Sequence, residues 1–458
     1  MNGSQIIYYE HQQYSDSTNL LSEHELQQLL DTNHVKLHGN PDGFMNSPKY
    51  LALDQNLQAS YYIGADWLIK NELSLIVTPK IANIDFTQMF LSALQTENDE
   101  DAKYFSKCYG IDLDKPAIEA PSVCNLLTPL LLIHYISLLE RLVSTGLKKD
   151  YITIIENLKG KIKGQILFSQ QLPQNIIPKR EYRTVCRYQT YTEDIPANRL
   201  LKKALLFARK MMQIWMQSHS SYRKIQSRIN KLFIAFTNVS EDIDITQVQH
   251  LQNNKLFKTY PDAVRVAKII LKRYDYSVSN ISEYNHTTPP FWIDMSRLYE
   301  MYVLNILRER YGKNILFQVS GYRGCKADYL HVEEKLIIDA KYKPRYNYSN
   351  EGILPDIREI SGYARDKRIL KSLGVETDEK EIKCLIIYPK QAFKDFLKSE
   401  LSDKEILNDL HELNIDNELS NSKNTLLWDS AKDIHPFRSF RKLNIAIPIL
   451  NMESSNTR

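Results

Sequence analysis

Residues 336–346 read LIIDAKYKPRY, an aliphatic run that ends in an aspartate and a lysine two positions apart. Side chains alternate between the two faces of a strand, so Asp339 and Lys341 point to one face while Ile338 and Ala340 point to the other. The aliphatic run is typical of a buried strand, and a charged pair at the end of such a strand is unexpected on structural grounds. The stretch therefore predicts both a central strand and a candidate reactive pair.

A second carboxylate is predicted to face this pair. The sequence ADYLHVEEKLIIDAK, residues 327–341, fits a hairpin with Glu333 and Glu334 in its turn, and this register sets Asp328 directly opposite Asp339. Directly opposed residues have Cβ atoms about 4.5–5.5 Å apart, so the two carboxylates repel each other and need a cation. Glu-Glu is a poor two-residue turn, which leaves a slipped register open.

Two carboxylates together with the backbone carbonyl of Ala340 make an all-oxygen ligand set that suits Mg²⁺. The Lys341 ammonium cannot ligate a metal, but it is placed to hold an attacking water and to offset charge in a phosphoryl transition state. The alternative is an ordinary surface hairpin in which Lys341 only neutralises Asp328 and Asp339.

Two helices add polar residues to this candidate site. Glu300 lies on the apolar stripe of its helix. If it is buried there, its carboxylate needs a partner such as a metal or Lys341. The alternative is an exposed position at the edge of the stripe. In a helix expected over residues 355–370, Glu359 and Tyr363 stand one turn apart on the same side. That helix either presents polar groups to a phosphate backbone or is a capped amphipathic helix.

Charge is unevenly distributed along the 458-residue chain, whose net charge is +4. Residues 141–231 hold 19 Lys and Arg against 5 Asp and Glu, whereas residues 391–436 hold 5 against 10. The basic middle fits a polyanion-binding surface, with a solvated helix face as the alternative. The cysteines and histidines form no disulfide or zinc pattern. No apolar run reaches the roughly 20 residues of a membrane span and no secretory signal opens the chain, so a cytoplasmic protein without a membrane partner is expected.

The order of these residues resembles the PD-(D/E)xK nuclease superfamily in its RecB-like branch, with matches at Glu300, Asp328, Asp339, Lys341, Glu359 and Tyr363. More specifically, the chain resembles the McrC family, the nuclease subunits of McrBC-type modification-dependent restriction systems. Segments spread over about residues 60–390 carry this likeness, namely LSLIVTPKI, GLKKDY, ENLKGKIKGQI, CRYQTYTEDIPANRLLKKAL, FWIDMSRLYE, LIIDAKYK and DIREISGYA. Two positions depart from the pattern: Ala327 replaces a proline, and Glu359 stands where related nucleases often carry glutamine.

The resemblance implies a Mg²⁺-dependent endonuclease that cuts double-stranded DNA and that binds and stimulates a hexameric ring of a McrB-type AAA+ GTPase. By the same resemblance, the metal is held by Asp328, Asp339, the Ala340 carbonyl and Glu300, with Lys341 positioning the water and Glu359 and Tyr363 in support. GTP is expected on the partner, because this chain has no GxxxxGK[ST] loop. The alternatives are a RecB-like repair nuclease that works without a GTPase, and a non-catalytic activator of a GTPase ring.

The expected fold class is a mixed, multidomain α+β protein. Residues 1–110 are expected to form a partner-engaging region with strands and 111–285 a mainly helical basic domain. Residues 286–458 are expected to form a PD-(D/E)xK, restriction-endonuclease-like α/β domain with a mixed sheet and an acidic insertion at about 398–436. The turn signals HTTPP at 286–290 mark the last boundary. The basic middle either engages the GTPase ring or tracks DNA phosphates, and the sequence leaves both open.

Overall fold

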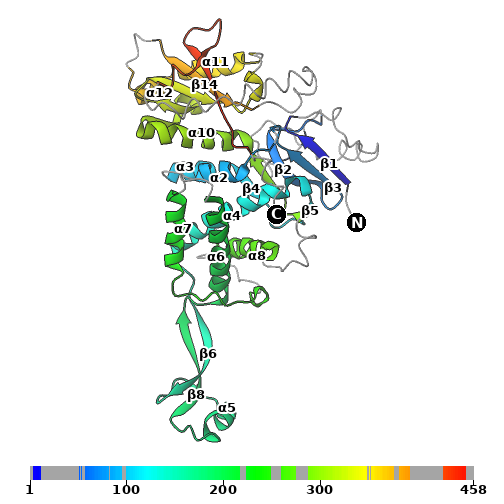
Figure 1. The fold of residues 1–458 in the computed structure, drawn as a ribbon, viewed down its shortest axis with the longest axis vertical. Helices are drawn as coiled ribbons and strands as arrows, with labels where there is room; N and C mark the ends of the chain where they lie inside the picture. Colours follow the sequence, from blue (N-terminus) through cyan, green and yellow to red (C-terminus); the bar gives the residue numbers. More distant parts are fainter. Residues whose placement is uncertain are drawn as a thin grey trace. The chain divides into compact units, whose positions relative to one another are not determined.

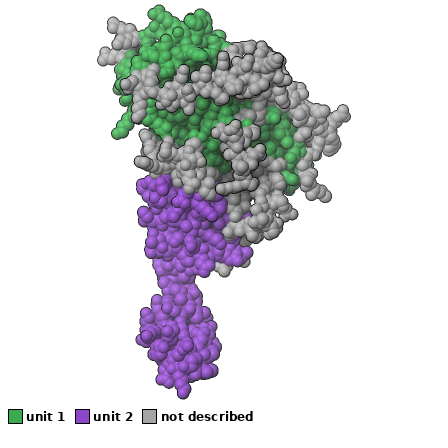
Figure 2. Space-filling view, in the orientation of Figure 1, with its two compact units in different colours: residues 1–129, 286–458 green, residues 130–285 purple. Residues whose placement is uncertain are grey.

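The computed structural model describes residues 4–11, 51, 53, 57–81, 83–94, 99–216, 223–248, 259–274, 287–347, 350, 352–375, 381–391 and 426–449. Most of the predicted acidic insertion therefore lies outside the described residues. The chain forms two compact units, one from residues 1–129 and 286–458 and one from residues 130–285 (Figure 2). The three-domain division stays a prediction, with its first and last ranges belonging mainly to the same compact unit.

The sheet that carries the candidate site is mixed, with strand order β11-β12-β13-β14-β16-β15. Its strands are β11 (Ile315–Ser320), β12 (Lys326–His331), β13 (Leu336–Ala340), β14 (Lys383–Pro389), β15 (Lys432–Asp433) and β16 (Phe440–Ile445). The first three strands pair antiparallel, whereas β13, β14 and β16 pair parallel. The expected mixed α/β organisation is therefore confirmed.

The hairpin of β12 and β13 has the predicted register. Tyr329 pairs with Ile338, and one step further along this register Asp328 stands across from Asp339. Residues 332–335 form the connection, so the turn has four residues rather than two. The longer turn avoids the two-residue geometry that Glu-Glu disfavours, which is why the register does not slip.

Helices cover both faces of this sheet (Figure 1). On one face Leu330 and Ile337 pack in a buried cluster with α11 (Leu354–Tyr363) and α12 (Lys367–Leu373). Tyr329 points the other way and donates a hydrogen bond to a backbone carbonyl of α10 (Met295–Tyr311). Strand alternation thus sorts neighbouring side chains between two helical layers.

The single helix expected over residues 355–370 is wrong, because two helices occupy that range. The Asp366 carboxylate accepts hydrogen bonds from the N–H groups of Arg368 and Ile369 and so caps a new helix, α12. Aspartate stabilises a helix start better than a helix interior, which explains the break.

A second sheet in the same unit combines strands from the first 111 residues with one strand at residues 291–294, in the order β1-β3-β2-β10-β4. Its strands are β1 (Ser4–Tyr9), β2 (Tyr62–Ile69), β3 (Leu73–Thr78), β4 (Tyr109–Ile111) and β10 (Phe291–Asp294). Helices α2 (Phe86–Leu94) and α3 (Asp99–Phe105) contact α10, and a small sheet pairs β5 (Ile118–Glu119) with β9 (Thr287–Thr288). Early residues therefore reach the helix that carries Glu300.

The unit of residues 130–285 contains α6 (Pro196–Met216), α7 (Arg223–Ala235), α8 (Tyr260–Tyr274) and the later part of α4 (Pro121–Thr145). Besides these expected helices it contains an antiparallel sheet of β6 (Asp150–Lys159), β7 (Gln165–Ile166) and β8 (Arg183–Thr192). The long β6–β8 hairpin carries α5 (Phe168–Gln171) and a π-helix (Leu172–Ile176) at one end (Figure 1). None of the described helices has both the length and the apolar character that crossing a membrane requires.

Candidate active site

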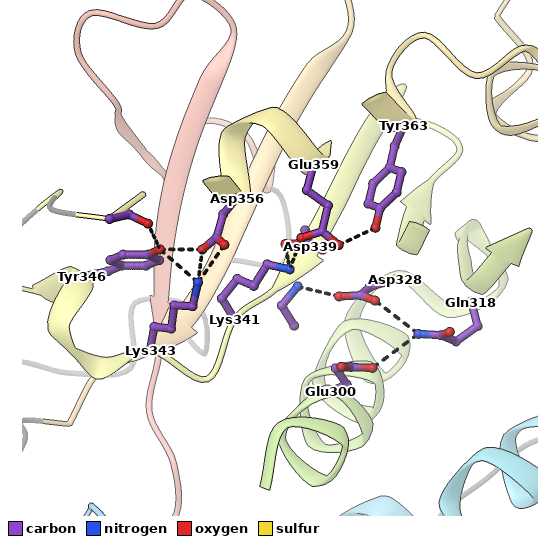
Figure 3. A network of polar contacts seen from close by, with 12 residues as sticks. Glu300, Gln318, Asp328, Asp339, Lys341, Lys343, Tyr346, Asp356, Glu359 and Tyr363 are labelled. Atoms are coloured by element: carbon purple, nitrogen blue, oxygen red, sulfur yellow. Dashed lines mark hydrogen bonds and ion pairs between the residues drawn. The ribbon is translucent and has the colours of Figure 1, made fainter. Parts of the chain in front are cut away.

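Asp339 and Lys341 lie at the end of the central strand β13 and share a face, as the alternation predicts (Figure 3). The Asp339 side chain is buried. Lys341 Nζ lies 2.9 Å from Asp339 Oδ2 and 2.8 Å from Glu359 Oε2. The backbone N–H of Lys341 donates to the Ile387 carbonyl at 2.8 Å, which carries the pairing with β14 one residue beyond the strand. The lysine is thus fixed by its backbone and by two carboxylates.

Asp328 reaches across the hairpin to the same strand end. Its Oδ2 accepts a hydrogen bond from the Ala340 N–H at 2.9 Å, and its Oδ1 accepts one from Gln318 Nε2 at 3.2 Å. At this end of the β12–β13 pairing, the Ala340 N–H therefore bonds to the Asp328 side chain rather than to a backbone carbonyl of β12. This contact brings the Asp328 carboxylate beside the Asp339–Lys341 end of β13.

Glu300 lies on α10 and is partly buried. Its carboxylate accepts hydrogen bonds from the Tyr104 hydroxyl and from Gln318 Nε2, the latter at 3.3 Å. Of the two positions that the sequence left open for Glu300, the structure agrees with the one that needs a partner, but the hydrogen-bond partners are Tyr104 and Gln318 rather than Lys341. Gln318 connects Glu300 to Asp328 (Figure 3), and Asp328 in turn accepts a hydrogen bond from the Ala340 N–H, between Asp339 and Lys341 in the chain.

Gln318 is a site residue that sequence reasoning missed. Its φ is 52°, a left-handed value inside β11, and its neighbours Phe317 and Val319 continue the pairing with β12 on either side. A left-handed backbone costs a non-glycine residue roughly 1–2 kcal/mol, so surrounding contacts must hold it. The amide that donates to both Glu300 and Asp328 is such a contact. The only sequence signal was a polar residue in an apolar strand.

Burial disfavours the ionised forms of Glu300, Asp328 and Asp339. Burial raises the pKa of Glu300 to about 7. Burial, followed by the charges of Glu300 and Asp339, raises the pKa of Asp328 well above its usual range. Burial also raises the pKa of Asp339, although the Lys341 charge works against it. One lysine does not offset three neighbouring acids, so the site has a deficit of positive charge.

Lys341 stays a cation in this setting. Burial works to lower its pKa, but the charge of Asp339 and the hydrogen bond and charge of Glu359 outweigh burial and raise the pKa above its usual value. An ammonium with a raised pKa donates hydrogen bonds and stabilises negative charge, and it does not accept a proton near neutral pH. Its chemistry is therefore electrostatic.

Asp328 and Asp339 are the residues of this site that could hold a divalent cation. Asp339 Oδ2 is buried and accepts no well-directed hydrogen bond from the described residues, although Lys341 Nζ is nearby. In the described part of the chain, no group of three or more His, Cys, Asp or Glu side chains is arranged to hold a metal ion. Mg²⁺ commonly takes only one or two carboxylates and keeps several waters, so a site built on Asp328 and Asp339 would not need a three-residue cage.

Glu359 and Tyr363 lie one turn apart on the same side of α11, as the helical spacing predicts, and Glu359 contacts the lysine. The Tyr363 hydroxyl donates to Glu359 Oε1 at 2.8 Å, and Lys341 binds the other oxygen. Burial alone would raise the pKa of Glu359, but the hydrogen bond and charge of Lys341 lower it below its usual value. Lys343, in the basic stretch after β13, is paired with Asp356 at 2.7 Å and so fixes the start of α11.

Comparisons with known proteins give one family. A family model described as "McrBC 5-methylcytosine restriction system component" matches residues 57–354, more than half of the chain. A solved half-complex from a tetradecameric assembly of Thermococcus gammatolerans McrB AAA+ hexamers with bound McrC is similar at 15% identity over 98% of this chain and 95% of that chain, with a TM-score of 0.38. A cryo-EM structure of the T. gammatolerans McrBC complex is similar at 15% identity over 68% and 89%, with a TM-score of 0.27. No curated protein matches.

Proposed function

Because the chain belongs to the family of McrBC 5-methylcytosine restriction system components, we propose that it is the nuclease subunit of such a system. In this proposal it hydrolyses phosphodiester bonds of double-stranded DNA with Mg²⁺, and it binds and stimulates a McrB-type AAA+ GTPase that supplies the GTP site. The observation that carries the proposal is the hairpin register, which continued by one step sets Asp328 opposite Asp339, together with the ion pair between Lys341 and Asp339.

The roles of the residues follow from their chemistry. Asp328, Asp339 and the Ala340 carbonyl would hold the metal, with Glu300 linked to Asp328 through Gln318. Bound Mg²⁺ supplies Lewis acidity at the phosphate and acidifies a water. Lys341 orients the attacking water and stabilises the negative charge that grows on the phosphoryl oxygens.

A PD-(D/E)xK, restriction-endonuclease-like fold is part of the proposal. Its support is local: an antiparallel hairpin leads into a parallel strand, and α10 and α11 bring polar residues to the same strand end from different helices. The six residues of the predicted motif fall in two adjacent groups of contacts (Figure 3): Gln318 links Glu300 to Asp328, and Lys341 links Asp339 to Glu359 and Tyr363. The alternative of a non-catalytic activator gains no support from a site that keeps its acids and its lysine together.

The proposed function is tested by mixing the protein with its partner GTPase, GTP, Mg²⁺ and plasmid DNA that is methylated or unmethylated. We expect cleavage only when all components are present. Degradation of linear DNA from its ends by this chain alone, without GTP, would favour the repair-nuclease alternative.

The β6–β8 hairpin supports the partner role. Apolar side chains are exposed on and around it, at Tyr151, Ile155, Ile162, Phe168, Leu172, Ile176, Ile177, Tyr182 and Tyr191. Exposed apolar groups gathered on one element mark a protein-binding surface more than a phosphate-binding one. We therefore assign this hairpin to the GTPase, with DNA as the alternative that its lysines and arginines leave open.

Replacing Phe168 and Ile177 together by aspartate is expected to reduce stimulation of the partner GTPase by about tenfold or more, because apolar anchors carry most interface energy. GTP hydrolysis measured with and without the variant is the test. Ile234→Asp, an equally exposed apolar position on α7, is the matched control and should stimulate normally. Unchanged stimulation with weakened DNA binding would assign the hairpin to DNA instead.

The metal-free protein is expected to lose stability as pH rises from about 5 to about 8. The folded pKa of Glu300, about 7, lies above its ordinary value of 4.5, so the folded state keeps a proton that the unfolded chain releases. Such a group stabilises the fold at low pH, and this contribution is lost as pH rises through the folded pKa. Mg²⁺ binds only the folded site and restores stability at pH 8.

Thermal unfolding at pH 6 and pH 8, with and without Mg²⁺, measures this effect. A variant with both Asp328→Asn and Asp339→Asn should show a flatter pH dependence and no response to Mg²⁺. If Mg²⁺ stabilises this variant as much as the wild-type protein, the metal binds elsewhere.

A further inference from the structure

Tyr104 contacts the candidate site from a distant part of the sequence. It lies on α3, 196 residues before Glu300, and its hydroxyl donates a hydrogen bond to Glu300 Oε2. Its ring packs edge-on against Phe317 of β11, with centroids 5.1 Å apart and an interplanar angle of 82°. The ring contact fixes the direction of the hydroxyl, so the hydrogen bond is built into the packing.

Helix α3 is itself anchored to α10, the helix of Glu300. Asp101 and Arg308 form an ion pair between the two helices, and both side chains are largely buried. One turn from Glu300, the Arg297 guanidinium lies over the Tyr104 ring and donates to the Lys107 carbonyl at 3.4 Å. The ion pair and the Arg297 contacts tie α3 to α10 at two points, so Tyr104 has a defined place relative to Glu300.

Both hydrogen bonds to the Glu300 carboxylate fall on one oxygen. Tyr104 and Gln318 donate to Oε2, and among the described residues no hydrogen bond is made to Oε1. Two donors from different elements hold a carboxylate in one rotamer more firmly than either alone. The arrangement keeps Oε1 available for a metal ion or a metal-bound water.

We propose that Tyr104 is a positioning residue of the nuclease site, which holds Glu300 in place for the metal. The inference rests on the proposed function and extends it: the site is not contained in residues 286–458 but needs a side chain from α3. Hydroxyl and carboxylate partners that orient metal-binding groups typically contribute 10- to 100-fold to metal affinity, so we expect about tenfold here.

The test compares Tyr104→Phe with Tyr302→Phe in the full-length protein. Phenylalanine keeps the ring on Phe317 and removes only the hydroxyl. Tyr302 is the matched control because it lies on α10 and donates to the Ala446 carbonyl at 3.1 Å, away from the three acids. Mn²⁺ binding is measured by calorimetry, and cleavage is measured with the partner GTPase over a range of Mg²⁺ concentrations.

We expect Tyr104→Phe to bind Mn²⁺ about tenfold more weakly and to need correspondingly more Mg²⁺ for half-maximal cleavage, with Tyr302→Phe unchanged. Adding Tyr104→Phe to Glu300→Gln should cause no further loss, because Tyr104 acts through Glu300. Wild-type affinity for Mn²⁺ in Tyr104→Phe, or losses that multiply in the double variant, would overturn this inference but not the proposed function. A wild-type protein that neither binds Mn²⁺ nor cleaves would overturn the proposed function and this inference with it.

Discussion

Asp339→Asn is expected to abolish DNA cleavage while leaving stimulation of the partner GTPase intact. The amide keeps the shape of the buried side chain but removes one of the two carboxylates that face each other across the hairpin. Loss of the metal's contribution corresponds to at least about 4 kcal/mol of transition-state stabilisation, or about 10³-fold in rate. The fold should tolerate the change, because burial already disfavours the ionised form of Asp339.

Plasmid cleavage and GTP hydrolysis, measured on the same preparation, separate the two activities. Asp433→Asn on β15 makes the same chemical change at an exposed position and should cleave normally. Asp328→Asn should reproduce the loss from the opposite strand. Cleavage by Asp339→Asn at the wild-type rate would remove this residue from the active site.

Lys341→Met is expected to slow cleavage by about 10²- to 10³-fold, the usual loss when an electrostatic stabiliser of the transition state is removed. Methionine keeps an unbranched apolar chain but removes the ammonium that lies between Asp339 and Glu359. Metal binding should persist, because the lysine is not a ligand. The measurement is single-turnover cleavage at saturating Mg²⁺, together with Mn²⁺ calorimetry.

Lys326→Met, at an exposed position on β12, is the control for this substitution. Arginine at position 341 should rescue poorly, since its planar guanidinium does not replace a compact ammonium. Normal cleavage by Lys341→Met would mean that the lysine only neutralises its two acidic neighbours. Loss of Mn²⁺ binding would instead give it a structural role at the metal site.

The parts of the site that depend on short-range periodicity could be predicted. A strand has a period of two, so a single assumption about the hairpin placed Asp328 against Asp339 and set Lys341 on the same face. Helical spacing likewise paired Glu359 with Tyr363. These predictions needed only neighbours within one element or across one turn.

The remaining features depend on contacts that the sequence does not encode locally. The hydrogen bond from Tyr104 to Glu300 joins residues 196 positions apart and follows from the docking of α3 on α10. The left-handed backbone of Gln318 accompanies hydrogen bonds to acids on two other elements, which the local sequence does not reveal. The break at Asp366 is different, because it has a local signal in the sequence. Aspartate is a common helix cap, and the prediction of one continuous helix did not take it into account.

Anomalous diffraction from crystals of the wild-type protein soaked in Mn²⁺ tests the central claim most directly. We predict a Mn²⁺ peak within bonding distance of the Asp328 and Asp339 carboxylates, with no peak there in crystals of Asp339→Asn. A Mn²⁺ site elsewhere, or none between these two aspartates at saturating Mn²⁺, would contradict the assignment of this strand end as the nuclease centre.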